Sequence, residues 1–103
     1  MGSLGTVPAI EVIENTTERR FEGYLSGTLV GYSDYEIVGD VIVFPHSYTL
    51  PEFRGHGIGA AVVQGAMDAV AAVGGLRVHP TCPFVRDWLD AHPAYSHLTR
   101  PPA

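Results

Sequence analysis

The segment that most constrains the fold is residues 54–59, Arg-Gly-His-Gly-Ile-Gly, which joins two stretches of different character. Before it, residues 41–49 begin with Val-Ile-Val-Phe, a run that favours a strand. After it, residues 58–73 carry apolar side chains at helical spacing. Free N–H groups at a helix start and the positive end of its dipole attract anions, and glycines allow close approach. The motif therefore predicts a site for a phosphate-bearing ligand, or else a glycine-rich connection with no ligand.

The chain before this motif predicts four strands joined by short turns. Alternating or β-branched residues cover 9–14, 20–25, 28–37 and 41–49. Connections such as Ser26-Gly27 suit tight turns, so we expect these strands to form an antiparallel meander. Pro45 lies inside the fourth stretch and has no N–H to donate. We therefore expect that strand to be disrupted near Pro45 and His46.

The chain after the motif predicts a helix, a short strand and a second helix. The buried face of the first helix is expected to hold Ile58, Val62, Ala66, Ala69 and Val73. Residues 76–79 follow as a strand, parallel to the fourth because a helix crosses between them. An amphipathic pattern at Phe84, Val85, Trp88 and Leu89 then predicts a second helix, and residues 94–98 one more turn. The expected fold class is α/β (α+β), a mixed, mostly antiparallel sheet with a crossover helix after the fourth strand and a short C-terminal helix.

Composition limits the partners of the chain. The 103 residues suffice for one domain, expected over residues 9–98 with a flexible N-terminus at 1–8 and a tail at 99–103. The net charge is −5 and every basic residue is arginine, which argues against nucleic acid or an anionic membrane as partner. One cysteine and no apolar run of membrane-spanning length fit a soluble protein of the cytoplasm.

Three phosphate-binding patterns compete for the glycine motif. A P-loop requires a lysine, and the sequence has none. A dinucleotide fingerprint is satisfied by Gly55, Gly57 and Ala60, but the next strand, residues 76–79, ends without the required acidic residue. The third pattern is Arg-x-x-Gly-x-Gly, placed between an interrupted strand and a helix.

That third pattern resembles the acyl-CoA signature Gln/Arg-x-x-Gly-x-Gly/Ala of the GNAT superfamily of N-acetyltransferases. Two further blocks are similar to short YjdJ-type members of that superfamily. Residues 46–52 resemble their His-Thr-x-Val-x-Pro segment, and residues 80–95 their Pro-x-Cys-Pro-Tyr/Phe-Val…His-Pro-Glu-Tyr ending. The sequence departs from these patterns at Ser47, Thr49 and Ala94. It also lacks the pair of helices that GNAT enzymes usually place after the first strand, which help to shape the acceptor site.

The resemblance implies a GNAT-like fold and acetyl transfer from acetyl-CoA to an amine of a small molecule or protein. A non-catalytic acyl-CoA-binding module is the alternative function. The pyrophosphate would lie on the backbone of Arg54, Gly55, His56, Gly57, Ile58 and Gly59. Arg54 then either adds charge or is an ordinary surface arginine. The pantetheine arm would pair with the backbone of Ser47, Tyr48, Thr49 and Leu50. Phe84 either touches this arm or belongs, with Trp88, to the core.

Cys82 and His46 are the candidate catalytic residues. Cys82 precedes Pro83, a favourable first residue of a helix, and a helix N-terminus lowers the pKa of a thiol. Cys82 is therefore a nucleophile that takes the acetyl group, a residue lining the thioester site, or an inert buried thiol. His46 either deprotonates the incoming amine or is structural. Tyr95 either protonates the leaving thiolate or packs at the C-terminus.

A zinc site is the remaining possibility that the sequence raises. His79, Cys82, His92 and His97 are the candidate ligands. The prolines at 80 and 83 constrain the first pair, and no second pair has the usual spacing, whereas a structural zinc site requires four convergent ligands. We therefore expect no metal.

Overall fold

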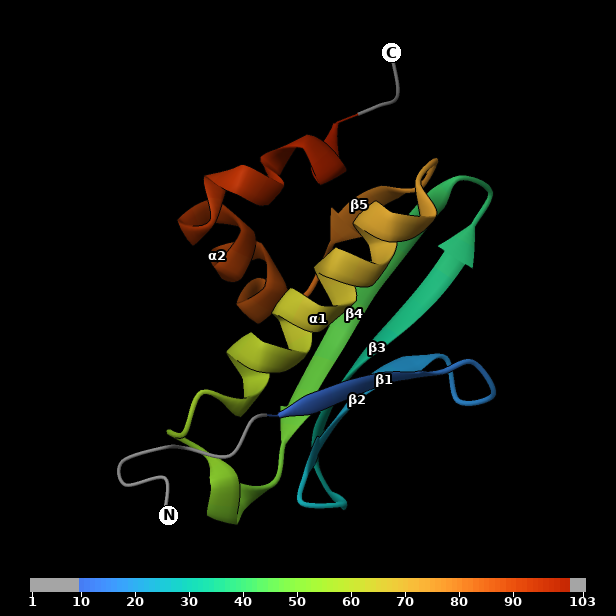
Figure 1. Ribbon diagram of the computed structural model, residues 1–103. Coiled ribbons are helices and arrows are strands. Elements are labelled where there is room, and N and C mark those ends of the chain that lie inside the picture. Colours follow the sequence, from blue (N-terminus) through green and yellow to red (C-terminus); the bar gives the residue numbers. More distant parts are fainter. Residues whose placement is uncertain (1–9, 101–103) are drawn as a thin grey trace.

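The computed structural model describes residues 10–100, which form a five-stranded sheet with helices (Figure 1). The elements are β1 (Glu11–Asn15), β2 (Arg20–Leu25), β3 (Thr28–Val38), β4 (Val41–Thr49), the 3-10 helix η1 (Pro51–Phe53), α1 (Ile58–Val73), β5 (Arg77–Pro80), α2 (Pro83–Ala91) and the 3-10 helix η2 (Pro93–Thr99). The strand order is β1-β2-β3-β4-β5. Neighbours are antiparallel except β4 and β5, which are parallel. The predicted fold class is confirmed.

Most element bounds agree with the sequence prediction, and the differences are small. β2, β4 and α1 have the predicted bounds, whereas β1 and β5 are shifted by one or two residues and β3 is one residue longer. The flexible N-terminus, the start of the first strand and the end of the tail were predicted at positions that lie outside the described residues. None of the helices formed by residues 10–100 is long and apolar enough to cross a membrane.

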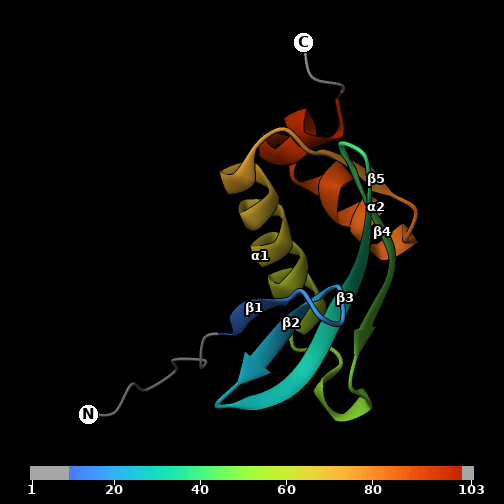
Figure 2. The same ribbon diagram turned by 90° about the vertical axis from the view of Figure 1, so that its right-hand side faces the viewer.

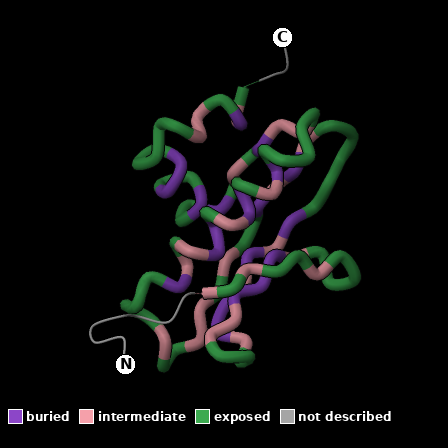
Figure 3. The backbone as a smooth tube through the Cα atoms, viewed as in Figure 1, coloured by how far each residue is buried: buried purple, intermediate pink, exposed green. Residues whose placement is uncertain are grey.

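Both helices and η2 pack on one face of the sheet, as the two perpendicular views show (Figures 1 and 2). The core lies in this layer, where the purple segments of Figure 3 meet. It contains Phe21, Val30, Ile42, Phe44 and Val78 from the sheet, Val62, Val63, Ala66, Met67 and Val70 from α1, and Val85, Trp88 and Leu89 from α2. The sheet therefore has an inner face under the helices and an outer face that carries no helix from the described residues.

The buried face of α1 is rotated from the predicted one near its end. Ile58, Val62 and Ala66 are buried as predicted, but Ala69 is only partly buried and Val73 is 73% exposed. Met67 and Val70 take their place in the core. The prediction for Val73 was wrong because the last turn of α1 carries this residue away from the core, to the surface.

The end of β4 differs from its beginning. Val41–Phe44 pairs with β3 on one side and with Arg77–Pro80 of β5 on the other. Beyond Phe44 the pairing with β5 stops, although pairing with β3 continues to Thr49. Opposite β3, the register shifts between Asp34 and Glu36, so that two residues of β4 oppose one residue of β3. The predicted disruption near Pro45 is thus a β-bulge followed by a strand edge that no other strand of residues 10–100 pairs with.

Candidate functional site

The N-terminus of α1 is built by glycines with left-handed backbone conformations. Gly55 has φ 84° and Gly57, the N-cap residue, has φ 76°, angles that cost little only for glycine. Among residues 10–100 no side chain caps the helix, and its first turn contains no acidic residue. The first N–H groups of α1 therefore have no partner within the helix and lie at the positive end of its dipole. This arrangement suits an anion.

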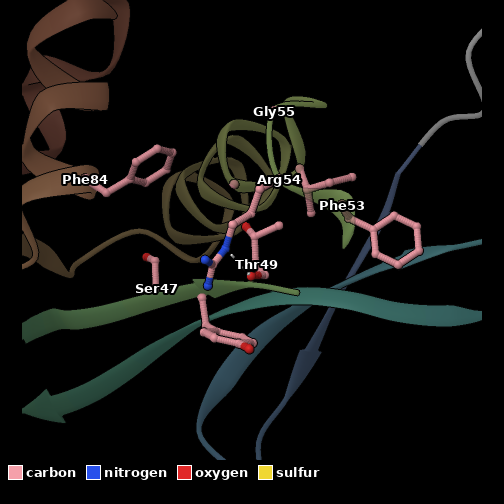
Figure 4. A pocket seen from close by; sticks show the side chains of 9 residues that line it. Ser47, Thr49, Phe53, Arg54, Gly55 and Phe84 are labelled. Carbon is pink, nitrogen blue, oxygen red and sulfur yellow. Dashed lines mark hydrogen bonds between the residues drawn. The ribbon is translucent and has the colours of Figure 1, made fainter. Parts of the chain in front are cut away.

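A pocket of about 340 Å³ lies beside this helix start, between the end of β4 and the beginning of α2. Figure 4 shows side chains from these elements around the opening. The lining residues are Ser47, Tyr48, Thr49, Phe53, Arg54, Gly55, Ile58, Gly59 and Phe84. All of them except Phe53 are among the predicted cofactor residues. The structure thus brings three separate sequence blocks together at one cavity.

Three predicted cofactor residues, Leu50, His56 and Gly57, do not line this pocket. Leu50 donates its N–H to the carbonyl of Val30 on β3, and His56 is exposed. Gly57 contributes through its conformation as the N-cap. Phe53, which sequence reasoning missed, lies in η1 and is partly buried against the core. Its aromatic ring, in an otherwise polar turn, was the available signal.

The alternation of side chains on β4 divides its end between the two faces of the sheet. Ser47 and Thr49 point toward the helices in Figure 4. Tyr48 points the other way, where its ring centroid lies 5.6 Å from that of Tyr32. Arg54 bridges the end of the strand: its Nε donates to the carbonyl of Thr49 at 3.0 Å, and its Cζ lies 5.7 Å from the centroid of the Tyr48 ring. Arg54 is therefore fixed at the mouth of the pocket.

Phe84 forms the wall of the pocket contributed by α2. It is 45% exposed, and a Cβ placed on Gly59 would lie 2.9 Å from its Cζ atom. The prediction that Phe84 is a core residue was therefore wrong. Within α2, Phe84 faces the cavity, whereas Val85, Trp88 and Leu89 face the core. Glycine at position 59 lets the ring rest on the first turn of α1.

Cys82 lies beside Ser47, just behind the pocket lining. It is 7% exposed and is the N-cap residue of α2. Its backbone N–H donates to the carbonyl of Phe44 at 2.8 Å, at the point where β4 and β5 separate. Its Sγ lies 3.8 Å from Ser47 Oγ, which in turn lies 2.9 Å from Ser33 Oγ. Sequence reasoning did not identify Ser33, because its partner is distant in the chain.

His46 lies on the outer face of the sheet and does not line the pocket, so its role as the base that deprotonates the amine stays a prediction. Its side chain is 55% exposed, and Nδ1 lies 3.1 Å from Asp34 Oδ2. Without the bulge, strict alternation from the buried Phe44 would direct His46 inward. The extra residue of β4 reverses this phase, so Ser47 faces the helices instead.

Tyr95, His92 and His97 have hydrogen bonds away from the pocket. Tyr95 OH donates to Asp68 Oδ1 at 2.6 Å, and this bond raises the pKa of Tyr95. His92 stacks on Trp88 and its Nδ1 lies 2.7 Å from the carbonyl of that residue. Within residues 10–100, no three His, Cys, Asp or Glu side chains converge as metal ligands do. Tyr95 thus has the packing contacts that the sequence also allowed, and His92 packs on α2.

The site and fold define the class of protein. The sequence model of the GCN5-related N-acetyltransferase family matches residues 20–98, and the chain belongs to this family. No curated protein matches the chain. The narrower similarity to YjdJ-type members stays a prediction.

Solved structures share this fold. A putative GNAT-family acetyltransferase from Xanthomonas campestris pv. campestris aligns with a TM-score of 0.57 at 18% identity, covering 95% of this chain and 88% of its own. An aminoglycoside acetyltransferase from an uncultured soil metagenomic sample, in complex with sisomicin, aligns with a TM-score of 0.56 at 16% identity. That alignment covers 82% of this chain and 57% of the aminoglycoside enzyme, so this chain spans little more than half of its length.

Proposed function

We propose that this protein transfers the acetyl group of acetyl-CoA to an amine. The observation that carries the proposal is that two sets of free backbone groups meet at one pocket. One set is the uncapped first turn of α1, and the other is the open side of β4 beyond Phe44. Acetyl-CoA has a pyrophosphate for the first and an amide-containing arm for the second. Membership of the family supports this cofactor.

The pyrophosphate of the cofactor would bind at the start of α1. The backbone of residues 54–59 leads into this position, where the Arg54 N–H already donates to the carbonyl of Pro51, and no acidic side chain lies in the first turn of α1. Arg54 is held by the hydrogen bond from its Nε to Thr49, so its guanidinium can add a charge-assisted bond to phosphate with little further ordering. The left-handed glycines allow the phosphates to approach the backbone.

The pantetheine arm would extend along the open side of β4. The N–H of Leu50 points to β3, where it bonds Val30. Because backbone groups alternate along a strand, the N–H groups of Thr49 and Ser47 point away from β3, toward the side that β5 has left. The amides of the arm can pair with these groups as an added strand does. Ile58 and Phe84 supply apolar walls.

The acetyl group would then lie near Ser47 and Cys82, where β4 and β5 separate. A free N–H of β4 stabilises the oxyanion when a neutral amine attacks the carbonyl. Collapse of the tetrahedral intermediate breaks the C–S bond, the CoA thiolate leaves, and the ammonium loses its proton to solvent. In a second route, the Cys82 thiolate attacks first and releases CoA. The amine then attacks the acetyl-Cys82 thioester and restores the thiolate.

A non-catalytic acyl-CoA-binding module is the second candidate function. One observation favours it: His46, the proposed base, faces Asp34 on the outer side of the sheet and not the pocket. Such a module would bind acetyl-CoA by the same backbone groups but would form no product with amines.

Thermal unfolding with CoA and acetyl-CoA tests the cofactor site. A ligand at 100 times its Kd stabilises the folded state by about 2.7 kcal/mol. We expect both ligands to raise the Tm, and Arg54→Ala to reduce the rise. Arg86→Ala is the matched control, because Arg86 is an exposed arginine that does not line the pocket. Absence of stabilisation by either ligand would exclude both candidate functions.

Mass spectrometry with a panel of amines separates the two functions. Acetylated amine and free CoA are expected if the protein is an acetyltransferase. A mass increase of one acetyl group on Cys82 before amine is added indicates the two-step route. Binding of acetyl-CoA with no product from any amine in the panel favours the binding module.

A further inference from the structure

Ser33 is a polar residue in an apolar layer. It lies in the middle of β3, faces the core and is 0% exposed. A buried hydroxyl is costly unless it forms a hydrogen bond. Its partner is Ser47 Oγ on β4, at 2.9 Å. Ser47 lines the pocket and lies 3.8 Å from Cys82 Sγ. Three polar side chains thus connect the core with the pocket.

The direction of the hydrogen bond between the two serines follows from burial. If Ser47 donated, the Ser33 hydroxyl hydrogen would have no acceptor among residues 10–100, at a cost of about 1–3 kcal/mol. If Ser33 donates, every group has a role. Ser47 Oγ then accepts from Ser33 and, through its second lone pair, from the Cys82 thiol. The Ser47 hydrogen is left to donate toward the pocket or toward a sulfur that carries negative charge.

We propose that Ser33 is a positioning residue that fixes Ser47 as a hydrogen-bond donor to the Cys82 thiolate. The proposal adds to the two-step route through Cys82, and its role in catalysis rests on the proposed function. Loss of the thiol proton leaves a sulfur that accepts the Ser47 hydrogen while Ser33 still holds Ser47 Oγ. A donor to a thiolate favours the charged form, so the serine pair makes Cys82 more nucleophilic at a given pH.

Other ionisable groups near Cys82 are the same in all variants that test this idea. They are His46 on β4, His79 on β5, and Arg86 and Asp87 on α2, all of them exposed, with Asp34 of β3 paired to His46. Their contributions to the pH dependence cancel when wild type and a serine variant are compared. The difference between the two profiles therefore measures the effect of the removed serine hydroxyl group on the alkylation of Cys82.

The experiment measures the rate of Cys82 alkylation by iodoacetamide against pH, in the whole protein without cofactor. Cys82 is the only cysteine, so the modified mass reports one site. We expect Ser33→Ala to move the midpoint of the profile to higher pH and to slow alkylation below it about threefold. Ser47→Ala should slow it about fivefold, the equivalent of one hydrogen bond of about 1 kcal/mol. The double variant should match Ser47→Ala, because Ser33 acts through Ser47.

Ser26→Ala is the matched control, because Ser26 is an exposed serine in the turn between β2 and β3. Its profile should equal that of wild type. A wild-type profile in folded Ser33→Ala would overturn the proposal, whatever Ser47→Ala shows, and leave Ser33 a purely structural residue. If Ser33→Ala does not fold, a wild-type profile in Ser47→Ala alone overturns it. The test is independent of cofactor binding: failure of CoA to raise the Tm of wild type contradicts the proposed function and not the serine pair.

Discussion

The two halves of β4 belong to one strand, with the bulge between them, and have opposite roles. Val41–Phe44 has strands on both sides, and its inward side chains, Ile42 and Phe44, are almost fully buried. The half from Pro45 to Thr49 keeps β3 on one side, and none of the strands within residues 10–100 pairs with its other side. Its inward side chains are small and polar. The comparison shows that this strand contributes buried side chains to the core where both of its edges are paired, and lines a pocket where only one edge is paired.

The largest loss of stability is expected from a substitution in Val41–Phe44, the half of β4 that is paired on both sides. Phe44→Ala removes a ring that is 0% exposed and that packs against Phe21 and Tyr35. We expect the free energy of unfolding in urea to fall by about 3–5 kcal/mol, because the cavity cannot fully collapse. A loss below about 1 kcal/mol would contradict the assignment of this half to the core.

The second-largest loss of stability is expected where β3 packs closely against residues 45–49 of β4, the open half. A Cβ on Gly31 would lie 2.9 Å from the backbone oxygen of Tyr48 and 3.1 Å from an Ile58 methyl group. Because a backbone atom cannot turn away, Gly31→Ala must displace β4 near the pocket. We expect a loss of about 2 kcal/mol, as for other overpacked sites, together with weaker stabilisation by CoA. If Gly31→Ala is destabilised but keeps the wild-type Tm shift with CoA, the position of β4 does not control CoA binding at the pocket.

Sequence reasoning was most accurate where the determining signals are local. The glycines at 55 and 57 and the apolar run after them fix the start of α1, and the predicted bounds of α1 agree with the structure. The prediction was least accurate where a single bulge, or the angle at which a helix packs, determines which way a side chain points. The bulge beside Pro45 reverses the faces of His46 and Ser47. The orientation of α2 decides that Phe84 faces the pocket.

Long-range pairs could not be predicted from the chain at all. Ser33 and Ser47 are ordinary serines in the sequence, and only the pairing of β3 with β4 brings their hydroxyl groups to 2.9 Å. Phe53 joins the pocket lining because η1 turns it toward the core. Residues from the segments that the resemblance indicated, 46–52 and 54–59, line the cavity, but the contacts between side chains from different segments depend on the tertiary structure.

A pH effect on stability should arise on β2, away from both halves of β4. Burial raises the pKa of Glu22, but hydrogen bonds from Tyr24, Arg20 and Asn15 outweigh burial and lower this pKa below the ordinary value of 4.5. A lowered pKa in the folded state contributes stability above the unfolded pKa, and that stability is lost as pH falls through the folded pKa.

Glu22→Gln should therefore lower the free energy of unfolding by about 1 kcal/mol at pH 7. The gap to wild type should narrow as the pH falls below about 4.5. Urea unfolding at pH 7, 5 and 3 measures this gap. The Tm shift produced by CoA at pH 7 should equal that of wild type, because Glu22 does not line the pocket. A gap that stays constant with pH would mean that the charge of Glu22 does not contribute.

The smallest effect on stability is expected in the open half of the site. Phe84 is 45% exposed, so Phe84→Ala should change the free energy of unfolding by about 0.5 kcal/mol or less. It should nevertheless reduce the CoA-induced Tm shift, since the ring forms the α2 wall over Gly59. Phe44→Ala and Phe84→Ala remove the same side chain from the two sides of the comparison. Two outcomes would contradict the assignment of stability to the paired half of β4 and of CoA binding to the open half. One is that Phe84→Ala lowers the free energy of unfolding as much as Phe44→Ala does. The other is that Phe84→Ala leaves the CoA-induced Tm shift unchanged.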